Sequence, residues 1–118
     1  MWEIEMVSEP LAIDALRAKA QEQFGDFVKG VVDVEQRVMA IGGELHADEE
    51  AHLLELGSRQ ADLWGINLYP AQYGRDDFVE FDSMINLRPS QNNRSRSVDD
   101  PQLRALIQEI VGELVSGG

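Results

Sequence analysis

The sequence contains no cysteine, and this absence excludes several chemistries at once. Disulfides, iron–sulfur clusters, thiolate zinc sites and cysteine nucleophiles all need a thiol. Long apolar runs are also missing, since no stretch approaches the roughly 18 residues of a membrane-spanning helix. The first residues show no positively charged region followed by an apolar run, so no signal peptide is visible. We therefore expect a cytoplasmic protein that does not enter a membrane.

Basic residues are scarce. The chain has 10 Lys and Arg against 22 Asp and Glu, which gives a formal net charge of −12. Such a charge disfavours general binding to nucleic acids, whose phosphates attract basic surfaces. The length of 118 residues, with 43% hydrophobic and 27% charged residues, is typical of a globular chain. We expect residues 1–118 to form a single domain.

Several well-known catalytic motifs are missing as well. The sequence has no Gly-x-x-x-x-Gly-Lys-Ser/Thr loop, no Gly-x-Gly-x-x-Gly, no Gly-x-Ser-x-Gly and no His-Glu-x-x-His. These absences lower the odds for nucleotide hydrolases, dinucleotide enzymes, serine hydrolases and zinc proteases. They leave enzymes of other types open, and the sequence indicates no particular cofactor.

The spacing of apolar residues predicts eight elements in the order β-α-β-β-α-β-β-α. Alternation is most regular from Phe78 to Arg88, and Asp100 followed by Pro101 marks the start of the last helix. We expect an α+β fold in which a mixed five-stranded sheet carries three helices on one face and leaves the other face open. The predicted strands cover residues 2–6, 28–34, 37–41, 63–69 and 78–88, and the helices cover 11–24, 47–56 and 101–115.

The segment from Arg88 to Arg96 is basic and rich in amides, and it contains no acid. Guanidinium groups surrounded by amide and hydroxyl donors are suited to binding a phosphate or carboxylate. Asp82 and Asn86 precede this loop on the same face of the predicted strand. We expect the ligand-binding residues to be Asp82, Asn86, Arg88, Ser90, Asn92, Asn93, Arg94 and Arg96. The alternative is a solvated loop whose arginines offset the carboxylates of the protein.

Both histidines lie in an acidic segment between Glu44 and Glu55. Imidazole and carboxylate together suit a divalent metal, and Glu44, His46 and Asp48 are the candidate ligands. His46 is also a candidate general base. The spacing favours another interpretation, in which the acids stabilise the positive end of a helix and face solvent.

Four segments resemble a small prokaryotic family of uncharacterised single-domain proteins. They are residues 23–26 together with 31–34, residues 42–48, residues 63–67 and the most specific one, Phe81-Asp82-Ser83-Met84-Ile85-Asn86-Leu87-Arg88-Pro89-Ser90-Gln91. The resemblance spans nearly the whole chain and implies a stand-alone cytoplasmic protein. It implies no activity and no catalytic residues, because the family is a domain of unknown function.

Three functions remain open from the sequence. The first is a binding module that recognises a small anionic ligand or an acidic protein surface through residues 88–96. The second is a metal-assisted or acid–base enzyme that uses Glu44, His46 and Asp48. The third is a homo-oligomer in which the basic loop of one copy meets the acidic helix start of another.

Overall fold

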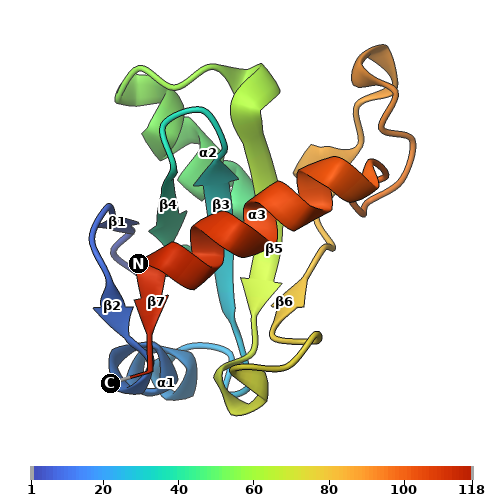
Figure 1. Ribbon diagram of the computed structural model, residues 1–118. Coiled ribbons are helices and arrows are strands. Elements are labelled where there is room, and N and C mark those ends of the chain that lie inside the picture. The colour runs from blue at the N-terminus through green and yellow to red at the C-terminus, as the bar shows by residue number, and fades with distance from the viewer. Residues whose placement is uncertain (1, 118) are drawn as a thin grey trace.

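A five-stranded antiparallel sheet lies at the centre of the computed structural model, which describes residues 2–117 (Figure 1). Its strands lie side by side in the order β1-β4-β3-β5-β6. A separate parallel pair, β2 with β7, joins the start of the chain to its end. The strands are β1 Glu5–Val7, β2 Leu11–Ala12, β3 Val28–Asp33, β4 Val38–Ile41, β5 Leu63–Leu68, β6 Val79–Glu80 and β7 Val115–Ser116.

Within residues 2–117, three α-helices and four short 3-10 turns complete the fold. Helix α3 begins as predicted, because the Asp100 carboxylate accepts a hydrogen bond from the Gln102 amide at 2.9 Å and Pro101 follows the cap. None of the helices between residues 2 and 117 has the length and apolarity needed to span a membrane. The helices are α1 Ile13–Glu22, α2 His46–Glu55 and α3 Pro101–Leu114, and the 3-10 turns are η1 Gln60–Asp62, η2 Pro70–Gln72, η3 Met84–Asn86 and η4 Pro89–Gln91.

The α+β class, the five-stranded sheet and the three helices are confirmed. The prediction of a mixed sheet is wrong in detail, since the only parallel pair lies outside the five-stranded sheet in the described part of the chain. The helix expected from residue 11 starts two residues later, because Leu11 and Ala12 pair with Val115 and Ser116.

The sheet is covered on both faces, so the expectation of three helices on one face is also wrong. On one face, Val32 and Trp64 belong to the large core that α1 and α3 cover. On the other, Val31 of β3 packs with Leu53 of α2 in a second cluster. Side chains of successive strand residues point to opposite faces, so the consecutive valines of β3 supply both cores.

The strand predicted over residues 78–88 is much shorter than its alternating pattern suggested. Only Val79 and Glu80 pair with β5, and the chain then forms the turns η3 and η4. Ser83 packs so closely on Gly65 that a Cβ added to this glycine would lie 2.5 Å from the Ser83 Cβ. Beyond β6 the edge of β5 is therefore covered by side chains of the turn.

Candidate functional site

Arg88, the first residue of the predicted binding loop, is bound within the protein. Its guanidinium donates to the backbone oxygens of Gln60, at 2.6 Å, and of Leu63. The same group lies 4.0 Å from the centre of the Trp64 ring, which is a cation–π contact. Burial lowers the pKa of Arg88 from its usual value. Arg88 therefore anchors the loop to the start of β5.

Two of the predicted amides also act inside the fold. The Asn93 amide nitrogen donates to the backbone oxygens of Asn86 and Ser97, both at 2.7 Å, and its oxygen accepts from the Asp99 amide at 2.8 Å. The Asn86 side chain is fully buried against Gly65. Both amides hold the loop in shape, and neither is open to a ligand.

The remaining loop residues are exposed. Ser90 and Asn92 face solvent, and Asn92 has a left-handed backbone with φ 59°. Arg94 is exposed too, and its backbone amide donates to the Asp99 carboxylate at 2.8 Å. The structure thus separates the predicted site into an internal part, an exposed part and the pair Asp82 and Arg96.

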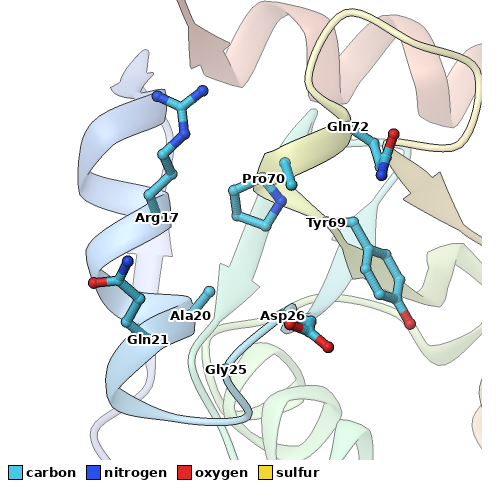
Figure 2. A pocket seen from close by; sticks show the side chains of 9 residues that line it. Arg17, Ala20, Gln21, Gly25, Asp26, Tyr69, Pro70 and Gln72 are labelled. Atoms are coloured by element: carbon cyan, nitrogen blue, oxygen red, sulfur yellow. The ribbon is translucent and has the colours of Figure 1, made fainter.

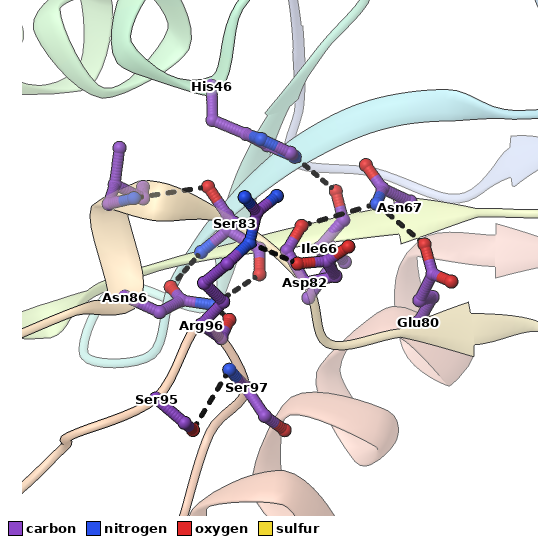
Figure 3. A network of polar contacts seen from close by, with 12 residues as sticks. His46, Ile66, Asn67, Glu80, Asp82, Ser83, Asn86, Ser95, Arg96 and Ser97 are labelled. Carbon is purple, nitrogen blue, oxygen red and sulfur yellow. Dashed lines mark hydrogen bonds and ion pairs between the residues drawn. The ribbon is translucent and has the colours of Figure 1, made fainter.

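Asp82 and Arg96 meet at a cleft on the α2 side of the sheet. The Arg96 Nε donates to the Asp82 carboxylate at 2.7 Å. The cleft has a volume of about 500 Å³ and lies between β5, the segment from β6 to η3, and the start of α2 (Figure 3). We call it the His46–Asn67 cleft. The polar and charged side chains that line it include Lys29, His46, Asn67, Glu80, Asp82 and Arg96.

His46 lies over β5, where its Nε2 is 2.8 Å from the backbone oxygen of Ile66. A carbonyl oxygen only accepts, so we assign the proton to Nε2. Burial lowers the pKa of His46 below 6.5, and the nearby Lys29 lowers it further, against the opposing effect of the Ile66 bond. The ring is therefore neutral at pH 7.

Asn67 supplies the most informative atom of the cleft. The residue is only 6% exposed, and its amide nitrogen donates to the Glu80 carboxylate at 2.8 Å. This contact orients the amide. Its buried oxygen then makes no hydrogen bond of normal geometry within residues 2–117, although the Asn67 side chain lies close enough to the His46 ring to raise the pKa of His46. Buried acceptors are normally satisfied, and an unpaired one costs about 1–3 kcal/mol.

An aromatic wall borders the polar lining. Phe27 and Tyr69 both line the cleft, with ring centres 5.4 Å apart. Phe24 stacks on Phe27 at 4.7 Å, and the Lys29 ammonium lies 4.9 Å from the Phe24 ring centre. The Tyr69 hydroxyl donates to Glu80 at 3.2 Å. Burial, followed by the charge of Glu80, raises the pKa of Tyr69.

The structure does not bring the predicted metal ligands together. His46 lines the His46–Asn67 cleft, whereas Glu44 and Asp48 line a different hollow beside Trp2. Within residues 2–117 no three His, Asp or Glu side chains are grouped closely enough to hold a metal ion. The Glu44 backbone oxygen accepts from the Lys29 ammonium at 2.9 Å.

A second hollow of about 390 Å³ lies between α1 and η2 (Figure 2). Arg17, Gln21, Asp26 and Tyr69 are among its lining residues. Arg17 is paired with Asp14 at 2.8 Å. None of the lining residues has a buried polar atom that lacks a partner in the described part of the chain. The His46–Asn67 cleft is thus the stronger candidate site.

Sequence reasoning missed Asn67 and Phe27 as site residues. The signal for Asn67 was present, because it is the only polar side chain in the buried strand β5. A polar residue in such a strand needs a partner or a function.

Fold and cleft together define a small α+β protein with a polar, aromatic-walled cleft on one face of an antiparallel sheet. The chain belongs to the family described as "Protein of unknown function (DUF5674)", whose model matches residues 5–114. The expected membership of an uncharacterised family is confirmed, and the prokaryotic origin stays a prediction. No curated protein and no solved structure shows a significant match to the chain.

Proposed function

We propose that the protein is a binding module that takes a small, uncharged polar ligand in the His46–Asn67 cleft. The observation that carries the proposal is the buried Asn67 amide oxygen, which has no partner among residues 2–117. A ligand with an N–H or O–H group would satisfy this acceptor. Clefts lined by aromatic side chains and a few placed polar groups are the usual form of small-molecule sites.

The charges of the cleft favour a neutral ligand over an anion. Two cations, Lys29 and Arg96, face two acids, Glu80 and Asp82, so the formal charge of this lining sums to zero. Arg96 is already paired with Asp82. A charged ligand would leave a net charge uncompensated in this balanced lining, and burying an uncompensated charge is costly.

The test is a titration of the isotope-labelled protein, followed by its amide resonances in NMR spectra. Acetamide serves as a neutral donor and inorganic phosphate as the anion. We expect acetamide to shift the Asn67 side-chain amide and the His46 resonances in a saturable way. Phosphate could instead shift only the resonances of residues 88–96. If Arg94→Gln abolishes those shifts, the result supports the anionic ligand predicted from the sequence.

The other predictions stay predictions. Acid–base catalysis would use His46 without Glu44 or Asp48 beside it. Self-association through the basic loop predicts a molecular mass that falls with added salt, because salt screens exposed charges. An acidic protein partner for the loop, like a cytoplasmic location, is untested.

A further inference from the structure

The His46–Asn67 cleft combines features that select one chemical class of ligand. We infer that the ligand is a polyhydroxylated ring, such as a monosaccharide or a cyclic polyol. This inference rests on the proposed function and names its ligand. It is carried by three properties of the cleft: a buried unpaired acceptor, partly free charged groups whose charges cancel, and an aromatic wall.

The buried acceptor requires a donor, and neighbouring groups require acceptors. Asn67 offers its amide oxygen, whereas Arg96 offers its two terminal nitrogens. Only the Nε of this guanidinium donates to a partner within residues 2–117, and Figure 3 shows the end of Arg96 directed toward His46. A hydroxyl group both donates and accepts. Adjacent hydroxyls on one ring can therefore serve Asn67 and Arg96 together.

The carboxylates of Asp82 and Glu80 add further hydrogen-bond acceptors to the cleft. Asp82 engages Arg96 through one oxygen, and Glu80 receives both the Asn67 amide and the Tyr69 hydroxyl on its Oε1. Each carboxylate has a second oxygen, which is a strong acceptor for a ligand hydroxyl. Because these acids are balanced by Lys29 and Arg96, the site provides charge-assisted hydrogen bonds without requiring a ligand charge.

The aromatic wall is the reason that we expect the ligand to be a ring. Phe27 and Tyr69 line the cleft beside its polar floor. A sugar ring presents C–H groups on its face and hydroxyls at its edge, so it can pack on an aromatic surface while its edge is hydrogen-bonded. An open-chain polyol has the same hydroxyls without a fixed face. The volume of about 500 Å³ lies within the usual range for small-molecule sites.

The experiment is an NMR titration of the whole chain with glucose, galactose, mannose and ribose. Sorbitol is the open-chain control, acetamide the neutral donor and glycine the zwitterion. We expect at least one sugar to shift the resonances of Asn67, His46 and Tyr69 in a saturable way, and to bind more tightly than sorbitol. Glycine should leave these resonances in place.

Three variants locate the binding. Arg96→Gln and Tyr69→Leu should each lower the affinity for the sugar by about tenfold, which corresponds to the loss of one good polar or aromatic contact. Arg94→Gln is the matched control, since this exposed arginine lies in the same loop outside the cleft, and it should leave binding unchanged. The unshifted amide spectrum of each variant away from the substitution verifies that it is folded.

Each outcome decides between the two proposals. If acetamide shifts the cleft resonances and no sugar does, the polyhydroxylated ligand is wrong and the binding module stands. If glycine binds more tightly than every sugar, the ligand is a zwitterion, and both the inference and the proposed uncharged ligand are overturned. If no probe shifts the cleft, both proposals fail.

Discussion

The side chain of Asn86 takes the place of a neighbouring strand beside Gly65. Its amide oxygen accepts from the Gly65 backbone amide at 2.8 Å, and its amide nitrogen donates to the Gly65 backbone oxygen at 2.9 Å. These two bonds reproduce the pairing that an antiparallel strand would make with β5. The same nitrogen donates to the Arg96 backbone oxygen at 3.0 Å, so one residue joins the sheet edge to the loop that carries Arg96.

Replacing this side chain should be costly. Asn86→Ala leaves both polar backbone groups of Gly65 without a partner in a buried site, and we expect a loss of about 2–5 kcal/mol in the free energy of unfolding. Urea unfolding followed by circular dichroism measures it. Ser90→Ala, an exposed change in the same region, should alter stability by less than about 0.5 kcal/mol. Equal effects of the two changes would contradict the strand-like role of Asn86.

Two glycines should respond to alanine in opposite ways. A Cβ at Gly65 would lie 2.5 Å from the Ser83 Cβ, so Gly65→Ala must displace the turn and should cost about 1–3 kcal/mol or more. Gly112 lies inside α3 with nothing within 4 Å of an added Cβ. Gly112→Ala should therefore stabilise the protein by about 0.5–1 kcal/mol, because alanine favours the helix. Thermal melting of both variants gives the sign of each change.

Glu49 should make stability depend on pH. It is fully buried, and burial raises its pKa from 4.5 to about 9. Between these values the folded chain holds a proton that the unfolded chain releases. The stability that this proton provides is complete below pH 4.5 and is lost as pH rises toward 9, by about 1.4 kcal/mol per pH unit.

Glu49→Gln tests this dependence with little change of shape. Glutamine stays neutral and can still accept the 2.9 Å hydrogen bond that the Gly43 amide donates. We expect the variant to be increasingly more stable than the parent protein as pH rises from 4.5 toward 9, in urea unfolding at a series of pH values. A stability difference that stays constant across this range would show that Glu49 is not protonated in the folded protein.

Arg88 and Arg94, the two arginines of the loop that do not line the cleft, should differ sharply in how much their substitution lowers stability. Arg88→Gln removes bonds to the backbone of Gln60 and Leu63 and the contact with Trp64, and it should destabilise the fold by about 2–3 kcal/mol. Arg94→Gln should change stability by less than about 0.5 kcal/mol, because this side chain is exposed. Denaturant midpoints compare the two. A larger effect at Arg94 would refute the anchoring role of Arg88.

Most of the regular elements could be predicted because their signals are local. The cap of Asp100 with Pro101 and the apolar stripe of α3 lie within one segment, and β3 and β5 are runs of buried residues. The alternation over residues 78–88 predicted too long a strand, because an alternating pattern carries no information about the residues that lie opposite it in the fold. Gly65 offers Ser83 and Asn86 a closer and more fully bonded arrangement than a continued strand.

The candidate site could be predicted from the sequence only in part. The sequence alone indicated that residues 88–96 are a basic, amide-rich exception in an acidic chain, and that Asp82 and Arg96 belong to the same region. Only the tertiary structure decided that Arg88 anchors the loop, that Asn93 shapes it, and that Arg96 reaches the cleft. The physical reason is that propensity and periodicity act over a few residues. The partners of a buried polar group come from distant segments, and sheet register and turn geometry determine which of them meet.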